Sequence, residues 1–170
     1  YLGDVVAKTS YDQLYDEHVF LFSVHSIQYL FGLESMELID VKPQTTHGGS
    51  MRYFIAHKGA HPVQKSVIEW LEKERVQGLN QSNTFKVFAD QVAKSKLDLV
   101  SLLKSLKKDG KRVGGYGATS KSTTILNYCG IGPDLIEYIS DTTPIKQGKF
   151  TPGMHIPVLP HEHFQSNPPD

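Results

Sequence analysis

The spacing of apolar residues predicts one helix near the start of the chain. Residues 1–22 mix polar and aromatic side chains without a clear period, and we expect a loop there. Ser23 is a suitable N-cap for a helix that ends at about Phe31, before Gly32. The apolar positions of this helix share one face: Ile27, Leu30 and Phe31.

Two alternating segments follow, 36–41 and 51–57, and we expect both to be strands. Pro43, Gly48 and Gly49 interrupt the residues between them, so 43–50 is predicted to be a connection. The short spacing favours an antiparallel pair. Because two strands alone are only marginally stable in water, we expect this pair to form the edge of a larger sheet whose other strands lie upstream.

Two further helices are expected in the middle of the chain, after a boundary at 59–63. The first covers 64–77 and is followed by Gly78. Ser82 or Asn83 is able to cap the second, which ends before Gly110, after a lysine-rich last turn that complements the helix dipole. Its apolar stripe is long: Phe85, Phe88, Val92, Leu99, Leu102, Leu103 and Leu106.

The pattern changes again after residue 111. We expect a strand at 112–115, a glycine-rich turn at 115–121, a helix at 122–129 and a strand at 135–140. Strand, turn, helix and strand form one βαβ unit, which implies a parallel sheet. Residues 142–160 are rich in Pro and Gly and are expected to be mostly loop, with 154–158 extended.

Composition limits the class of protein. The chain has 170 residues, enough for one domain or two small ones, with 18 basic and 18 acidic residues and a formal net charge of zero. We therefore expect no nucleic-acid partner and no membrane association, since no apolar run approaches about 20 residues. One cysteine, Cys129, allows no internal disulfide and fits a cytoplasmic setting. The first residue is Tyr, and both ends of the chain suggest a piece of a larger protein.

The glycine-rich turn is the first candidate binding site. Gly115 and Gly117 follow a strand and precede a helix, an arrangement that lets backbone N–H groups approach a phosphate. Asp141 ends the next strand, 26 positions after Gly115, where a ribose-binding acid is expected. Ser120 stands in place of the third glycine of a dinucleotide site. A phosphate-loop variant ending in Ser120 and Lys121, or a tight turn without any ligand, remain alternatives.

Two further clusters carry chemistry. Tyr15, Glu17 and His18 are the parts of an acid/base site, although spacing alone favours an ordinary surface loop. His47 precedes two glycines, and Arg52 is able to hold an anion, although a simple hairpin turn explains this segment equally well. No established metal-ligand spacing is present, and we expect no metal in this chain.

Five motifs in order resemble one known family. The segment from Tyr15 to Ser23 is similar to the Y-x-E-H-x-x-x-F-S stretch of the S-adenosylmethionine (SAM)-dependent nucleotide-sugar C-methyltransferases, of the sugar C-3 methyltransferase type. Four further segments match the same family: His47–Arg52 (HGGSMR), Gly114–Lys121 (GGYGATSK), Leu126–Gly130 (LNYCG) and Asp141–Gly153 (DxxPxKQGxxxPG). The likeness covers nearly the whole chain.

The resemblance implies a domain organisation within the α/β class. Residues 1–58 would be the tail of a Rossmann-like methyltransferase domain, with its helix and antiparallel edge strands. Residues 62–170 would be the C-terminal domain, in which helices lead into a degenerate Rossmann-like βαβ unit. SAM would be bound mainly by the upstream part of the first domain, and zinc would belong only to a separate N-terminal module.

The resemblance also implies roles. His18 would remove a proton from the carbon next to the keto group of a nucleotide-linked deoxy sugar, Tyr15 would donate a hydrogen bond to the ketone or enolate, and Glu17 would orient His18 or hold the sugar. The 170-residue piece alone is expected to be inactive. A non-enzymatic nucleotide- or dinucleotide-binding module is the main alternative, and a phosphate-loop kinase is a second one. The substrate-binding positions would be His47, Arg52, Gly115, Gly117, Ala118, Lys121, Asp141 and Lys146.

Overall fold

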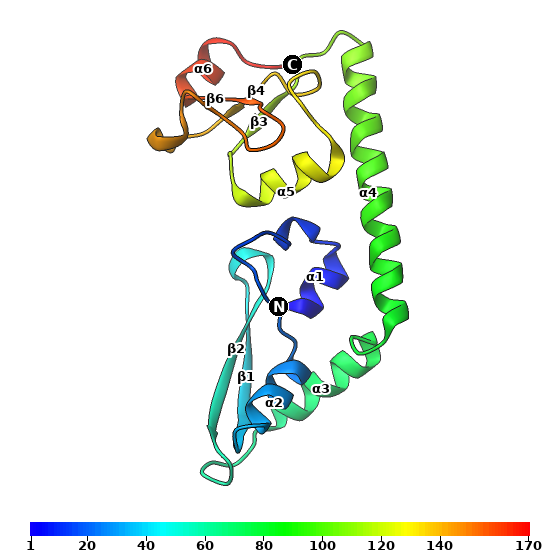
Figure 1. The fold of residues 1–170 in the computed structure, drawn as a ribbon, viewed down its shortest axis with the longest axis vertical. Coiled ribbons are helices and arrows are strands. Elements are labelled where there is room, and N and C mark those ends of the chain that lie inside the picture. Colours follow the sequence, from blue (N-terminus) through cyan, green and yellow to red (C-terminus); the bar gives the residue numbers. More distant parts are fainter. The chain divides into compact units, whose positions relative to one another are not determined.

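The chain folds into two compact units (Figure 1). The structure is a computed structural model that describes all residues, 1–170. The first unit contains residues 1–10 and 18–91, and the second contains 11–17 and 92–170. The chain therefore passes from one unit to the other three times, and each unit is described by itself below.

The first unit is built on a two-stranded antiparallel sheet, as the alternating segments predict. Strands β1 (Met36–Gln44) and β2 (Ser50–His57) pair from Met36 opposite His57 to Gln44 opposite Ser50. Helices α2 (Val24–Gly32) and α3 (Lys65–Gln77) pack on β1. A 3₁₀ helix, η2 (Thr46–Gly48), joins the strands. The core gathers apolar side chains from all these elements except η2: Val24, Ile27, Leu38, Val41, Met51 and Val67.

A buried carboxylate from α3 supports the start of α2. Ser23 caps the helix as expected, in a capping box with Ser26. Glu74 is 3% exposed, and its carboxylate accepts the N–H groups of Val24 and His25 and the hydroxyl of Tyr1. A negative charge at this position satisfies two backbone donors that have no partner within the helix and complements the helix dipole.

Two expectations about the first unit are wrong. Residues 1–22 are not all loop, because Leu2–Lys8 form helix α1, with Asp4 and Lys8 paired one turn apart at 3.2 Å. Seven residues make about two turns, too few for a periodic pattern to be visible. Gly32 does not follow α2 as its stop but is the last residue of the helix, and the residue with a left-handed backbone lies later, at Ser35 (φ 56°).

The second unit contains a four-stranded sheet in the order β3-β4-β6-β5. Strands β3 (Gly114–Tyr116), β4 (Tyr138–Ser140) and β6 (Pro157–Leu159) are parallel, and β5 (Lys149–Phe150) is antiparallel to β6. Helix α5 (Ser120–Cys129) connects β3 to β4, and the 3₁₀ helix η3 (Pro144–Lys146) follows β4. Buried side chains of α5, β4 and the loops around them form the core: Leu126, Cys129, Ile131, Leu135, Ile139 and Ile156, joined by Leu103.

Two short helices and part of a long one complete this unit. The short helix α6 (His161–Ser166) follows β6, and the 3₁₀ helix η1 (Tyr11–Gln13) packs on α5. Helix α4 (Ser82–Lys108) contributes its first ten residues to the first unit and the remainder to the second. Neither α6 nor the packing of η1 was expected from the sequence, since both involve segments of six residues or fewer.

The predicted α/β class and the βαβ unit are confirmed. Strands β3 and β4 are shorter than expected, whereas β1 and β2 are longer and leave only residues 45–49 as their connection. Helix α5 begins at Ser120 rather than Ser122 because Thr119 forms its cap. The domain boundary at 59–63 stays a prediction, although α3 packs with the first unit. None of the helices is both long and apolar enough to cross a bilayer.

Candidate functional site

The glycine-rich turn after β3 needs glycine for two different reasons. A Cβ at Gly115 would lie 2.9 Å from Cγ1 of Ile139 in the neighbouring strand, so any side chain here would force Ile139 to shift. Gly117 has φ +87°, a left-handed conformation that side chains disfavour. The N–H of Gly117 donates to the carbonyl oxygen of Ser140 at 2.8 Å, and this N–H is therefore occupied by a protein acceptor.

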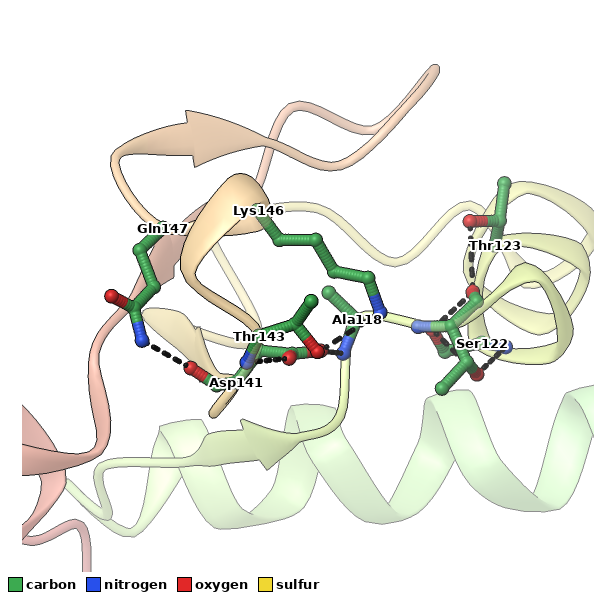
Figure 2. A network of polar contacts seen from close by, with 8 residues as sticks. Ala118, Ser122, Thr123, Asp141, Thr143, Lys146 and Gln147 are labelled. Atoms are coloured by element: carbon green, nitrogen blue, oxygen red, sulfur yellow. Dashed lines mark hydrogen bonds and ion pairs between the residues drawn. The ribbon is translucent and has the colours of Figure 1, made fainter.

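Asp141, at the end of β4, fastens the same turn from the other side (Figure 2). One carboxylate oxygen accepts the N–H of Ala118 at 2.7 Å and lies 3.3 Å from Nζ of Lys146. The other oxygen accepts the N–H of Thr143 at 2.8 Å, and the amide of Gln147 donates to the Asp141 carbonyl oxygen at 3.0 Å. The structure thus brings together Asp141, Ala118 and Lys146, three of the positions singled out from the sequence.

The charge on this carboxylate is well stabilised. Asp141 is 5% exposed, and burial alone would raise its pKa. Hydrogen bonds from Thr143 and Ala118, together with Lys146, outweigh burial and lower the pKa from 3.8 to about 2. A carboxylate held in this way keeps the turn closed. It is not positioned as a free acceptor for ribose hydroxyls, the role that the 26-residue spacing indicates.

The first turn of α5 presents the remaining open donors. Thr119 and Ser122 form a capping box, with bonds of 2.9 and 3.1 Å between their hydroxyls and backbone N–H groups. The N–H groups of Ser120 and Lys121 have no protein acceptor, as is usual at this position of a helix. The turn holds no acidic residue, and Lys121 places a cation where the helix dipole disfavours one. An anion bound here would relieve both features.

A cavity of about 390 Å³ opens beside this turn, where the chain leaves β3 and α5 begins. On one side it is lined by the first turn of α5, and on the other by η3 and β5. Lys146 is paired with Asp141, whereas Lys149 is exposed and has no ion pair. Phe150 and Ile145 are 63% and 74% exposed. The residues that give the cavity its chemical character are Thr119, Ser120, Thr123, Lys146, Lys149 and Phe150.

The candidate acid/base residues lie on an irregular segment, where the sequence leaves the second unit and re-enters the first. Tyr15 and Glu17 belong to the segment 11–17, which packs with the second unit, whereas His18 is the first residue of the part that packs with the first unit. Glu17 is exposed, and Tyr15 and His18 are partly exposed. Their assignment as acid/base groups stays a prediction.

His47 and Arg52 lie on the hairpin of the first unit. His47 is in η2 with a left-handed backbone (φ 53°). A side chain at Gly49 (φ +139°) would collide with Asp4 of α1, and Lys8 of the same helix donates to the carbonyl oxygen of Gly48. Arg52 is exposed, has no ion pair and stands opposite Lys42 in the neighbouring strand. Like charges facing each other are unfavourable, so an anion at Arg52 would be stabilising.

Comparison with known proteins gives the family. The family model of the C-methyltransferase C-terminal domain matches residues 45–170. The chain belongs to this C-methyltransferase family. Among curated proteins, C-methyltransferase NovU of Streptomyces niveus is 36% identical over 171 residues, which covers 100% of this chain and 41% of that protein. The chain thus spans less than half the length of the curated relative. The family match includes the turn, the cavity, His47 and Arg52, and it begins before the predicted boundary at 59–63.

Several residues of the candidate site were missed in the sequence. Thr143 follows Asp141 by two positions, the spacing at which an aspartate side chain accepts a backbone N–H, and this signal was available. Thr119 precedes Ser122 by three positions, which is a capping-box spacing. Lys149 and Phe150 carried no local signal, since they reach the cavity through strand pairing.

Proposed function

We propose that this chain is part of a SAM-dependent C-methyltransferase that methylates a carbon next to the keto group of a nucleotide-linked deoxy sugar. Membership of the family supports methyl transfer to carbon. The observation that carries the choice of substrate is the cavity beside the first turn of α5, where cations are in excess of anions. A nucleoside diphosphate is the anionic part of such a substrate.

In this proposal the diphosphate lies at the first turn of α5. The open N–H groups of Ser120 and Lys121 donate to its oxygens, and the helix dipole adds to the attraction. Lys121, Lys146 and Lys149 contribute positive charge around it. Lys146 is able to contact both groups, because its ammonium has three N–H donors and Asp141, at 3.3 Å, does not use all of them. Phe150, exposed at the rim, offers an apolar face to the rest of the nucleotide. Gly115, Gly117 and Asp141 hold the turn in shape.

The turn does not fit SAM. In a dinucleotide-type site, a free carboxylate after the second strand binds the ribose hydroxyls, and here the Asp141 carboxylate is committed to Ala118, Thr143 and Lys146. SAM supplies the methyl group when bound, and none of the residues described above is assigned to hold it. The proposal places it in the part of the protein that the 41% coverage of the curated relative leaves outside this chain.

In this proposal, residues of the segment 15–18 carry out proton transfer. His18 takes the proton from the carbon beside the ketone, because a histidine imidazole is the side chain most often used as a general base. Tyr15 donates a hydrogen bond to the oxygen that gains negative charge as the enolate forms, and Glu17 orients the imidazole. His47 and Arg52 belong to the first unit and are kept as candidate substrate-binding residues.

The test is calorimetric titration of the full-length protein with a nucleoside diphosphate, NAD and SAM, together with an assay of methyl transfer. We expect the nucleoside diphosphate and SAM to bind and NAD not to bind. His18→Ala should keep nucleoside-diphosphate binding and lose turnover. Unchanged turnover in this variant would remove His18 as the base.

A non-enzymatic nucleotide-binding module is the second candidate, favoured by the cavity alone. It predicts binding of a nucleoside diphosphate without any methyl transfer by the full-length protein. The 170-residue chain by itself is expected to bind the nucleotide and to transfer no methyl group, so transfer by this piece would contradict the proposed division of labour.

A further inference from the structure

Tyr11, the first residue of the segment 11–17 in the second unit, is buried against α5. It is 7% exposed, and its hydroxyl lies 3.6 Å from Sγ of Cys129. Its ring meets the ring of Tyr128 edge-on, with 5.5 Å between centroids. Burial and the contact with Cys129 raise the pKa of Tyr11 to about 12, so the hydroxyl stays protonated. A phenol enclosed in this way has no face left for a substrate.

A second tie follows three residues later. The hydroxyl of Thr124, on α5, donates to the carbonyl oxygen of Leu14 at 3.2 Å, and the carbonyl oxygen of its own preceding turn, on Ser120, is farther away at 3.4 Å. The N–H of Leu14 donates to the carbonyl oxygen of Tyr11 at 3.0 Å. Both ends of the turn 11–14 are therefore fixed to α5, one by a side chain and one by the backbone.

These ties lie directly before the candidate acid/base residues. Tyr15 follows Leu14 in sequence, and Glu17 is the last residue of the segment that packs with this unit. The segment is seven residues long and is irregular after η1. An irregular segment of this length loses much conformational freedom when it is ordered, so specific contacts are needed to hold it in one conformation.

We propose that Tyr11 and Thr124 are positioning residues that dock the segment 11–17 on α5 and so place Tyr15 and Glu17 for proton transfer. The inference rests on the proposed function for the roles of Tyr15 and Glu17. The structural basis of the inference is that one helix makes both contacts. Helix α5 begins at the turn proposed to bind the diphosphate, and one turn later Thr124 bonds to the segment that carries Tyr15. One rigid helix thus relates the nucleotide end of the substrate to its reacting end.

The test uses four variants of the full-length protein: Tyr11→Phe, Tyr11→Ala, Thr124→Val and the conservative control Thr124→Ser. We expect kcat for methyl transfer to fall by about 10-fold or more in Tyr11→Ala and Thr124→Val, since misplacement of a catalytic group by about 1 Å costs up to about 100-fold. KM for the nucleotide sugar and the Kd for the nucleoside diphosphate should stay within about 2-fold, because the cavity is untouched. Thr124→Ser keeps the donor and should restore kcat.

A second readout does not depend on activity. Amide hydrogen exchange of residues 11–17 should become faster in Tyr11→Ala and Thr124→Val and stay unchanged in Thr124→Ser, with exchange in β3 and β4 as in the parent protein. Tyr11→Phe keeps the ring and should give the mildest change. Slow exchange of residues 11–17 in both Tyr11→Ala and Thr124→Val would overturn the inference whatever their activity.

The activity data separate the two proposals. If Tyr15→Phe abolishes turnover while Tyr11→Ala and Thr124→Val keep the parent kcat, the positioning role is refuted and the proposed function stands. If Tyr15→Phe and His18→Ala both keep full turnover, the proposed function fails, and hydrogen exchange alone decides whether Tyr11 and Thr124 dock the segment.

Discussion

Replacing Asp141 by asparagine should destabilise the second unit by about 2–3 kcal/mol at neutral pH. The carboxylate accepts two backbone N–H groups, and asparagine keeps only one carbonyl oxygen for them. Either Ala118 or Thr143 then faces an NH₂ group, and a buried donor without an acceptor costs about 1–3 kcal/mol. The attraction to Lys146 is lost as well.

The pKa of Asp141 gives a second route to the same magnitude. It falls from 3.8 to about 2, which at about 1.4 kcal/mol per pKa unit corresponds to about 2 kcal/mol in favour of the charged, folded form. Because the folded state lowers the pKa, this contribution is complete above about pH 5 and disappears as the pH falls through about 4 toward 2. The difference between parent and Asp141→Asn should therefore shrink on acidification.

The assay is urea unfolding followed by circular dichroism, repeated between pH 7 and pH 3. Amide exchange of Ala118 and Thr143 provides a local measure of the same contacts. Asp98→Asn is the matched control, because Asp98 pairs with Lys94 on an exposed face of α4 in the same unit. That pair should contribute less than about 1 kcal/mol. Equal stability losses in the two variants, or a loss in Asp141→Asn that does not change with pH, would refute the reasoning.

Three further predictions follow from single contacts. Glu74→Gln should destabilise the first unit by about 2–4 kcal/mol, because the uncharged amide keeps one acceptor oxygen for two helix N–H groups. Trp70 fluorescence during urea unfolding measures this loss. Gly115→Ala should cost about 1–3 kcal/mol through its collision with Ile139, whereas Gly32→Ala, with open space around it, should be neutral or stabilising in the same thermal melt. Lys149→Ala, in the cavity lining, and Lys121→Ala, in the first turn of α5, should each weaken nucleoside-diphosphate binding about 3- to 10-fold in calorimetry, with a smaller effect at high salt.

The fold was predictable wherever the signal was local and repeated. Helix α2 combined a cap residue with an apolar face, and α4 carried a stripe over several turns. The hairpin was visible because strands of eight and nine residues allow alternation to be seen. Strands of two or three residues, such as β5 and β6, contain no period at all, and their existence depends on partners that are distant in sequence.

The candidate site was predictable in its residue types and less so in its contacts. The glycine turn, Asp141 and Lys146 were all identified by spacing, and the structure places them together. What spacing could not give is which acceptor each donor chooses. The N–H of Ala118 goes to Asp141 because β3 and β4 are adjacent and parallel, which is a property of the sheet and not of the turn sequence. The burial of Tyr11 against α5 likewise depends on the tertiary fold and on no local pattern.

Because the Asp141 carboxylate is occupied by protein donors, it limits which ligands this unit is able to recognise. A turn that binds a dinucleotide needs its N–H groups and a free acid after the second strand at the same time. In this chain the N–H of Gly117 donates to Ser140 of the neighbouring strand, and the N–H of Ala118 donates to the Asp141 carboxylate. Only the N–H donors of the first turn of α5 remain without a protein acceptor. The available recognition is therefore shifted from the turn to the helix start and the lysines beside it. That shift favours a diphosphate over a ribose as the group bound. Because NAD also contains a diphosphate, the measurement that tests this most directly compares binding of a nucleoside diphosphate with binding of the nucleoside alone.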